Sequence, residues 1–322
     1  SSKAADARFQ AGRFENRSAR PFHFPSWTRD GLMGTDWSYW AVQTLNGLQL
    51  SMLLFLLSVG LTVIFGLLHF VNLAHGALYA LGAFIGISAA GATGSYWAGF
   101  AAAPVVVALT GLLLYLGLMK RMRRAGPMNQ VLVTLGLIFV FVDIFRLIWG
   151  DIALGTAEPE LFTGRSELFG VIYPTYRLFI IGLGAVVMAA LALVLSRTQL
   201  GAMIRAGVDN DQMAACLGVN VERIFFLVFC VGCALAGLAG AVAAPVFSAH
   251  PDMGTEILIS TLIVVVVGGM GSLRGAVAGS FLVGFAQTFG TVLIPGVASL
   301  LIYILLAVVL VFRPTGLFPA RA

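Results

Sequence analysis

The sequence is poor in charged residues. Only 10% of its 322 residues are Asp, Glu, Lys or Arg, whereas an ordinary soluble domain has about 25%. Apolar residues make up 59%, and the mean hydropathy is +0.97. This composition excludes a soluble enzyme, a disordered chain and a nucleic-acid-binding module. Basic loops on the cytoplasmic side of a membrane account for the net charge of +5 more simply than a nucleic-acid partner does.

Lysine and cysteine are scarce as well. Neither Lys3 nor Lys120 follows a glycine, as the nucleotide-binding P-loop requires, so the chain cannot hydrolyse ATP by that route. Cys230 and Cys233 form a C-x-x-C inside an apolar run with no second pair, which favours packing over a metal site or a disulfide framework. His, Asp and Glu likewise lack the spacing of metal ligands. We therefore expect neither a metal nor an enzymatic function.

Long apolar runs fill the chain beyond a polar, Arg-rich tail at 1–40, which lacks the apolar core of a signal peptide. About 20 apolar residues cross about 30 Å of hydrocarbon as a helix. The sequence therefore predicts an all-α polytopic membrane protein, with eight or nine transmembrane helices in a domain at 41–319. The seventh run is short, so it is either a half-helix or a full crossing. The runs lie at 41–68, 76–91, 96–119, 128–149, 177–196, 224–248, 256–269, 275–292 and 298–313.

Loop charges predict the topology. Basic residues at 120–124 and in the loop 197–223 place both segments in the cytoplasm, because short cytoplasmic loops are enriched in Lys and Arg. The loop 150–176 contains four acidic residues and a single basic one, Arg165. This composition is consistent with a position on the outer side of the membrane. Nine crossings then place the basic tail outside, against the rule. Either a long tail escapes the rule or one early run does not cross.

The first interruption of the apolar sequence is FVNLAHG at 70–76, with Asn72, His75 and Gly76. Polar backbone at membrane depth is tolerated only where protein buries it or where it lines a water-filled cavity. One interpretation is a pore-lining break that meets the solute. The other is a polar cap that satisfies the carbonyls at helix ends. The residue types alone leave both open.

The second interruption is GGMGSLRG at 268–275, with Gly269, Gly271 and Ser272. Its glycines permit sharp turns and close backbone approach, which favours a helix-hairpin turn over a binding loop. The stretches 61–86 and 258–284 share one order: an apolar run, a short break, and a helix rich in Gly and Ala. Transporters are often built from such repeats. We therefore expect two broken-helix pseudo-repeats.

The cytoplasmic loop 197–223 contains the sequence signals of a short helix with a cap at each end. Candidate N-cap residues at 209–211 precede a short helix through Met213, and Gly218 stands where a glycine would end that helix. A capped helix between two spans is suited to dock a cytoplasmic partner. A solvated loop helix without a partner fits the spacing equally well.

Polar and small residues inside the runs are interpreted as structural. Asp143 and Arg146 lie three apart on one helical face, which predicts a buried ion pair near the outer membrane face. Two stripes of small residues would let helices pack closely in lipid. These stripes are Gly232, Ala236 and Gly240, and Ala276, Ser280 and Gly284.

Four segments together carry a specific resemblance. They are VNLAHG with the following LYALGAF, RAGVDNDQMAACLGVNVERI, LAGLAG with PDMG downstream, and VVVVGGMGSLRGAVAG; the final RPTGLF also fits. From about 41 to 319 the chain resembles the LivH-type permease subunits of branched-chain amino acid ABC importers.

The resemblance implies a multi-pass permease of the bacterial inner membrane, without a cofactor of its own. Its partners would be membrane lipid, a second homologous permease, two cytoplasmic ATPase subunits that bind ATP and Mg²⁺, and a periplasmic solute-binding protein. The expected translocation path consists of Asn72, His75, Gly76, Gly269, Gly271 and Ser272. The expected ATPase-coupling residues are Arg205, Asp209, Asp211, Met213 and Gly218.

One departure from the family concerns the solute. Many amino-acid members have an acidic residue after the His-Gly pair, where this chain has Ala77. Related permeases serve urea, short amides and aromatic carboxylates. The predicted solute is therefore a small polar molecule: a branched-chain or other amino acid, or a related carboxylate.

The alternative to an ATP-driven importer is an ion-coupled secondary transporter or channel. Such proteins usually keep several ionisable residues within their spans. Here few candidates occur, and most lie near the ends of the runs. They are His69, His75, Asp143, Arg146 and Glu256.

Overall fold

The computed structural model describes residues 37–68, 72–122, 126–168 and 170–318. The chain falls into two compact units, Ser1–Tyr39 and Trp40–Ala322. Of the first unit only residues 37–39 are described, so most of the predicted tail lies outside the described residues. His69, Phe70 and Val71 of the first break lie outside them too. The fold described below is that of the second unit.

The observed helices match the predicted apolar runs to within about three residues at nearly every boundary, because hydrophobic length fixes transmembrane helices more strongly than any local signal. The helices are α2 (Trp37–Leu68), α3 (His75–Thr93), α4 (Tyr96–Leu114), η2 (Tyr115–Met119), α5 (Lys120–Met122), α6 (Pro127–Trp149), η3 (Glu160–Phe162), α7 (Thr175–Arg197), α8 (Gln199–Asp209), α9 (Asp211–Cys216), α10 (Val221–Phe247), α11 (Met253–Gly268), α12 (Leu273–Leu293), η4 (Pro295–Val297) and α13 (Ala298–Phe312).

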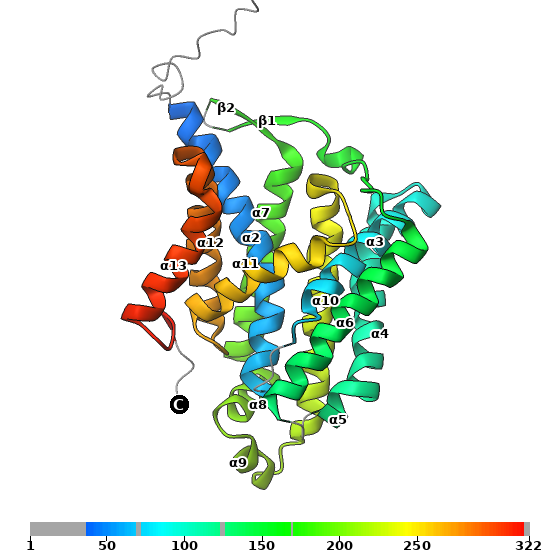
Figure 1. The fold of residues 1–322 in the computed structure, drawn as a ribbon, viewed down its shortest axis with the longest axis vertical. Coiled ribbons are helices and arrows are strands. Elements are labelled where there is room, and N and C mark those ends of the chain that lie inside the picture. The colour runs from blue at the N-terminus through cyan, green and yellow to red at the C-terminus, as the bar shows by residue number, and fades with distance from the viewer. Residues whose placement is uncertain (1–36, 69–71, 123–125, 169, 319–322) are drawn as a thin grey trace, which may run out of the picture. The chain divides into compact units, whose positions relative to one another are not determined.

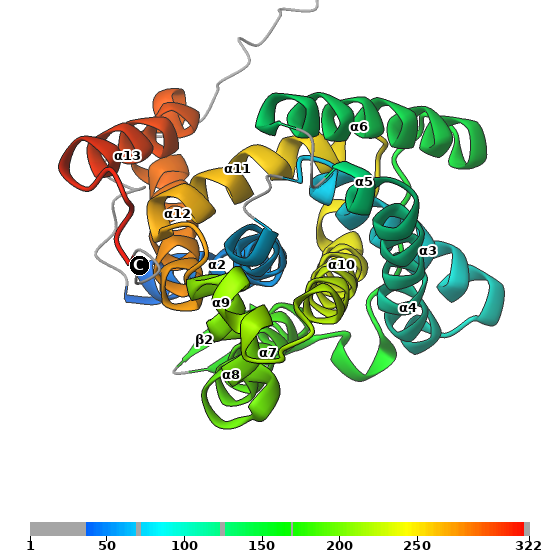
Figure 2. The same ribbon diagram turned by 90° about the horizontal axis from the view of Figure 1, so that it is seen from below.

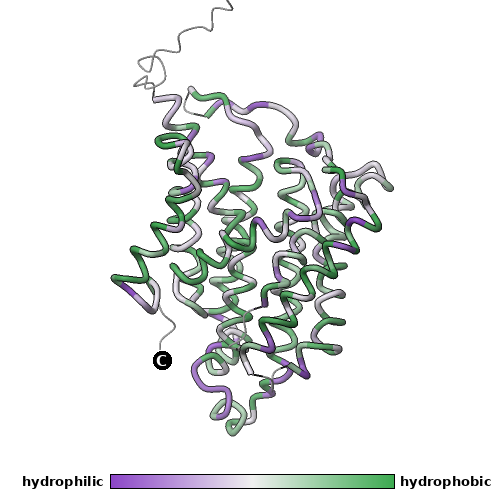
Figure 3. The backbone as a smooth tube through the Cα atoms, in the orientation of Figure 1, coloured by the Kyte–Doolittle hydropathy of each residue, from purple (hydrophilic) through white to green (hydrophobic). Residues whose placement is uncertain are grey.

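Seven helices in the described part of the chain are long and apolar enough to cross a membrane, and two shorter apolar ones lie at Met253–Gly268 and Leu300–Phe312. Hydrophobic residues dominate the helices, whereas hydrophilic residues gather in the connecting segments at the two ends of the bundle (Figure 3). The protein is an all-α polytopic membrane protein, as predicted. The number of crossings, eight or nine, stays a prediction.

Helix α11 differs from its neighbours in direction. In Figure 2 the view runs along α2 and α10, whereas α11 is seen lengthwise, and it also runs across the bundle in Figure 1. Its 16 residues measure about 24 Å at 1.5 Å per residue. A tilted helix of that length is too short for about 30 Å of hydrocarbon. The half-helix alternative for this run agrees with the geometry.

The outer loop contains a small feature that the sequence analysis missed. Strands β1 (Arg165–Leu168) and β2 (Val171–Pro174) pair antiparallel, with Ser166 opposite Tyr173. Val171 and Tyr173 are buried, whereas Ile172 between them is exposed. This alternation is typical of a half-buried strand. Two strands of four residues each are too short for the alternation to be recognised in a sequence made mostly of long apolar runs.

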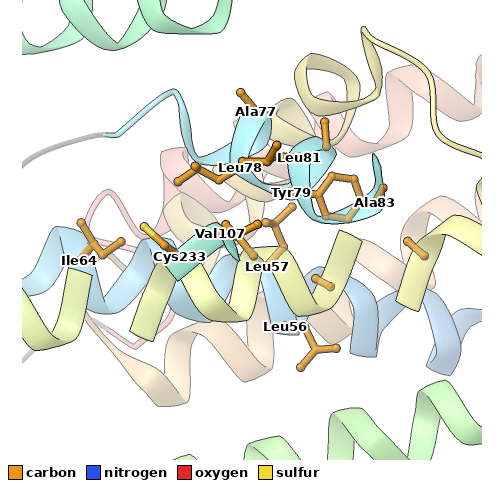
Figure 4. Packing of buried hydrophobic residues seen from close by; sticks show 14 of the residues in the cluster. Leu56, Leu57, Ile64, Ala77, Leu78, Tyr79, Leu81, Ala83, Val107 and Cys233 are labelled. Atoms are coloured by element: carbon orange, nitrogen blue, oxygen red, sulfur yellow. The ribbon is translucent and has the colours of Figure 1, made fainter. Parts of the chain in front are cut away.

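The core is densest where α3 lies against α10. A side-chain carbon added to Gly82 would meet the backbone of Gly237, and one added to Gly240 would meet the carbonyl oxygen of Tyr79. Figure 4 shows Tyr79, on α3, and Val107, on α4, among the buried residues of one hydrophobic cluster. Small residues let the helix backbones approach this closely in lipid. The predicted packing role of the stripe that includes Gly232 and Gly240 is confirmed.

Polar contacts mark the two ends of the bundle. Lys120 Nζ lies 2.6 Å from Glu222 Oε1, so the two loops predicted to be cytoplasmic lie at the same end. At the other end Asn46, near the start of α2, accepts hydrogen bonds from Tyr173 Oη at 3.0 Å and Arg177 Nη1 at 2.9 Å. This opposition of the two ends agrees with the predicted alternation of loops.

The predicted ion pair on α6 is wrong. Arg146 pairs instead with Asp151, at 3.3 Å, and with Asp252, at 3.1 Å, while Asp143 is exposed. Arg146 lies at the C-terminal end of α6, where a long guanidinium side chain reaches outward to loop carboxylates. Pairing there avoids the cost of burying two charges within the bundle.

Candidate translocation path and coupling loop

The first break is buried within the chain. Asn72 is 1% exposed and His75 is fully buried. His75 begins α3, and its Nε2 lies 3.1 Å from the carbonyl oxygen of Leu57 on α2. This contact requires the tautomer that carries the proton on Nε2. The His75 ring thus bonds a carbonyl in the interior of α2 rather than one at a helix end, so the polar-cap interpretation stays a prediction.

Three polar atoms of the same break have no hydrogen-bond partner among the described residues. They are Nδ2 and Oδ1 of Asn72 and Nδ1 of His75. A buried polar atom without a partner costs about 1–3 kcal/mol, and ordered water commonly satisfies such groups. The break therefore has hydrogen-bond donors and acceptors that no contact within the described residues uses. A place in the translocation path stays a prediction for Asn72 and His75.

Gly76 fixes how closely α3 approaches α11. A side-chain carbon at Gly76 would meet the backbone carbonyl of Gly254, and one at Gly254 would meet the backbone of Gly76. Two glycines in reciprocal contact leave no room for a methyl group between the helices. Gly76 thus has a packing role, whatever its part in transport.

The second break is a helix-hairpin turn, as the glycine pattern favours. Gly269 and Gly271 have φ angles of 109° and 80°, which glycine adopts without steric cost. Ser272 then caps α12, because its Oγ accepts a hydrogen bond from the Gly275 backbone N–H at 3.2 Å. The path role of Gly269, Gly271 and Ser272 stays a prediction.

The segment after α13 closes this turn. The backbone N–H groups of Leu317 and Phe318 donate to the carbonyls of Val267 and Gly268, each at 2.9 Å. These are carbonyls at the end of α11, which have no partner within their own helix. Sequence reasoning matched RPTGLF to the family but missed this role, since only the folded chain brings residues 317–318 to α11.

The structure does not bring His75 of the first break and Gly271 of the second together. His75 contacts α2 at Leu57, whereas Gly271 packs against Gly66 of the same helix. These positions on α2 are nine residues apart in the sequence, or about 14 Å along the helix axis. A continuous path that includes both breaks would have to extend over that distance.

The loop 197–223 folds as predicted around a capped short helix. Asn210 caps α9 through its Oδ1, which accepts from the Met213 backbone N–H at 2.8 Å. Gly218 follows α9 with a φ of 86°. The N–H of Val219 bonds the carbonyl of Ala214, and that of Gly218 the carbonyl of Ala215. This is the Schellman ending that a glycine at this position predicts.

Helix α9 presents an apolar surface. Met213 and Leu217 are 60% and 78% exposed, while Ala214 between them is buried. Arg205, Asp209 and Asp211 are exposed as well. The two apolar side chains are four residues apart and therefore share one face. Met213 is thus one of the predicted coupling residues and part of an exposed apolar pair, and the coupling itself stays a prediction.

The sequence is similar to known transport proteins along most of its length. The family model described as "Branched-chain amino acid transport system / permease component" matches residues 43–310. The high-affinity branched-chain amino acid transport system permease protein BraD of Pseudomonas aeruginosa is 30% identical over 290 residues, covering 85% of this chain and 94% of that protein. The corresponding LivH of Escherichia coli K12 is 27% identical over 305 residues, covering 88% and 97%.

A more distant similarity concerns half of the chain. The ribose import permease protein RbsC of Haemophilus influenzae is 30% identical over 176 residues, or 50% of this chain and 54% of that protein. No solved structure matches. Because the family model covers residues 43–310, which include both breaks, α9 and most of α13, the chain belongs to the family of branched-chain amino acid transport permease components.

Proposed function

We propose that this chain is the transmembrane permease subunit of an ATP-driven importer in the bacterial inner membrane. Its solute would be a branched-chain or other amino acid, or a related small carboxylate. The family match over residues 43–310 is the observation that carries this proposal. The names of the two relatives that span most of their length, both branched-chain amino acid permeases, support the solute class.

In this proposal the chain hydrolyses no ATP. Two separate ATPase subunits with bound ATP and Mg²⁺ would do so, and a periplasmic binding protein would deliver the solute to this permease and a second homologous one. ATP-driven closure of the partners would then open the path alternately to each side. The chain's own contribution is a docking helix, α9, and a route by which its movement reaches the breaks.

Contacts at the cytoplasmic end support that route. A side-chain carbon at Gly207, on α8, would lie 3.2 Å from Leu67 near the end of α2. Helix α2 leads directly into the first break, and its Gly66 packs against the second. A displacement of α8 and α9 by the ATPase would therefore press on the end of α2, which both breaks adjoin.

The test is the coupling between solute and ATP hydrolysis in the reconstituted complex. The Met213→Ala variant should lower binding-protein-stimulated ATPase activity about tenfold, as expected when an anchor at an interface is lost. Leu193→Ala is the matched control, because Leu193 on α7 is also apolar and 61% exposed. The variant with Leu217→Ala in addition should abolish stimulation, while the protein still inserts into membranes.

Two outcomes would contradict the proposal at different points. Stimulated ATPase activity that survives both Met213→Ala and Leu217→Ala would remove α9 and the residue that follows it from coupling. Solute uptake by this chain alone in liposomes, driven by an ion gradient and indifferent to ATP, would favour the ion-coupled transporter or channel over an importer subunit.

A further inference from the structure

A cleft opens between α11 and the α12–α13 hairpin. Its cavity volume is about 210 Å³, room for about seven water molecules at about 30 Å³ each. That is the size class of a single small solute rather than of a peptide. Three helices contribute its lining, which consists of Glu256, Ile259, Ser260, Gln287, Thr291, Ile302 and Tyr303.

Polar side chains in this cleft lack partners. Ser260 is only 8% exposed, and its hydroxyl makes no hydrogen bond within the described part of the chain. The Gln287 amide and the Tyr303 hydroxyl are equally without a partner there. Polar groups inside apolar helices are costly in lipid unless they meet water, a ligand or one another. The cleft is therefore built to hold something polar.

The cleft also has a defined charge. Glu256 is its one ionisable carboxylate among the lining residues, and no Lys or Arg lines it. His250 Nε2 lies 3.4 Å from Glu256 Oε2, so a single carboxylate oxygen makes this contact and the other is available. A carboxylate at the mouth of an uncharged polar cleft attracts a primary ammonium group.

The remaining lining complements the rest of an aliphatic amino acid. Ser260, Gln287 and Tyr303 can each donate a hydrogen bond to a carboxylate without carrying a charge. Ile259 and Ile302 supply apolar surface of the kind that accepts a branched aliphatic side chain. Ammonium, carboxylate and hydrocarbon groups of one small solute thus each have a counterpart.

We propose that this cleft is a solute subsite that binds a zwitterionic aliphatic amino acid, with Glu256 holding the ammonium group. The proposal rests on the proposed function and narrows its solute class. It also supplies the carboxylate that the first break lacks, where Ala77 follows the His-Gly pair. The amine of the solute would then be recognised by Glu256 on α11 rather than at the first break.

The experiment measures water access and solute protection by thiol labelling. The three native cysteines are replaced by alanine, and Ser260→Cys is introduced into the complete complex in lipid nanodiscs, without ATP. The probe is N-ethylmaleimide, which is small and uncharged and reacts with the thiolate that forms in water. Ile304→Cys is the control, because Ile304 neighbours Tyr303 on α13 and is exposed but does not line the cleft.

We expect Ser260→Cys to react about tenfold faster than Ile304→Cys, since only the cleft thiol meets water. L-Leucine should slow the reaction several-fold. Neither 4-methylpentanoate, which lacks the amine, nor isoamylamine, which lacks the carboxylate, should protect at the same concentration. Gln287→Cys provides a second reporter on another helix, should Ser260→Cys fail to assemble.

The Glu256→Gln variant tests the assigned role of the carboxylate. In the Ser260→Cys background it should keep the fast labelling and lose the protection by L-leucine. Thr255→Val, a change at the exposed neighbour on α11 that does not line the cleft, should keep both.

The proposal is overturned if both cleft reporters react no faster than Ile304→Cys in the complex, because lipid or the second permease would then fill the cleft. Equal protection by L-leucine and 4-methylpentanoate, or protection that persists in Glu256→Gln, would overturn the amino acid assignment. Labelling needs no ATP, so uptake by the unmodified complex separates the two proposals. Protection by L-leucine without ATP-driven uptake would support the subsite and contradict the importer function. ATP-driven uptake without protection would support the importer function and contradict the subsite.

Discussion

The two breaks resemble each other in sequence and differ in their surroundings. Each contains glycine and polar residues between apolar runs. The first is enclosed by other helices: Leu57 of α2 meets His75, and Gly254 of α11 meets Gly76. The second is a turn closed by the Ser272 cap, by Gly66 of α2 and by the segment at 316–318, the last two of which are distant in the sequence. Similar composition therefore serves a buried polar contact and close helix packing in one place and a capped turn in the other.

The difference shows which contacts stabilise each break. Residues of the first break depend on helices far away in the sequence, so a substitution there disturbs packing between α2, α3 and α11. In the second break, Ser272 acts within three positions of itself, through its bond to Gly275, whereas Gly271 also depends on Gly66 of α2. Substitutions of His75 and Gly76 should therefore have larger effects than substitutions of Ser272 and Arg274.

The largest effect is expected from Gly76→Ala. The added methyl group would meet the Gly254 carbonyl and force α3 away from α11, which should lower the free energy of unfolding by about 3 kcal/mol. Gly136→Ala on α6 is the control, since nothing lies within 4 Å of an added carbon there and alanine favours helices by up to about 1 kcal/mol. Thermal unfolding in detergent compares them. Equal transition temperatures would show that α3 and α11 separate freely.

His75→Ala should have the next largest effect. It removes the contact with Leu57 and leaves a cavity in the core, which together cost about 2–3 kcal/mol. In the second break, Arg274 is exposed, so Arg274→Ala should change stability by no more than about 0.5 kcal/mol. Denaturant titration of both variants would check this. A His75→Ala protein as stable as Arg274→Ala would mean that His75 serves transport alone.

Most of the fold could be predicted because transmembrane helices follow from the length of apolar runs. The nine runs, the shortness of the one at 256–269 and the cap at Gly218 needed only local signals. The Arg146 pairing could not be predicted, since its partner Asp252 lies over 100 residues away. The hairpin formed by β1 and β2 escaped because its alternation covers only four residues in each strand.

The candidate site was less predictable. Asn72, His75 and Gly76 were identified from their residue types, but burial and the contact with Leu57 depend on α2. Of the cleft, only Glu256 gave a signal, as an ionisable residue near the end of a run. Gln287 and Tyr303 are single polar residues in apolar helices, and no periodicity shows that they meet Ser260. Three helices must assemble before the cleft exists.

A smaller effect is expected from Ser272→Ala in the second break. The hydroxyl caps one backbone N–H of α12, and the loss of such a cap costs about 1 kcal/mol. Ser272→Asn keeps a side-chain oxygen in reach of the same N–H and should remain near the original stability. Thermal unfolding of the three proteins measures the difference. If the Asn variant were as unstable as the Ala variant, the contribution of Ser272 would come from something other than capping.

The smallest effect on stability is expected from Asn72→Leu, although it lies in the more sensitive break. Both polar atoms of the Asn72 side chain are buried and lack a partner among the described residues. Replacing such an amide by an apolar group of similar size should leave the free energy of unfolding within about 0.5 kcal/mol or raise it. Asn46→Leu is the control, because Asn46 accepts hydrogen bonds from Tyr173 and Arg177. Its loss should cost about 1–3 kcal/mol.

Transport then decides what the unbonded amide of Asn72 is for. If solute passes the first break, Asn72→Leu should slow uptake by the reconstituted complex although the protein is fully stable. It should slow every accepted solute by a similar factor, because a passage that gripped one solute would release it slowly. Competition among leucine, urea and an aromatic acid measures this. A stable Asn72→Leu protein with normal uptake would remove Asn72 from the path. A reordered preference would instead make it a residue that selects the solute.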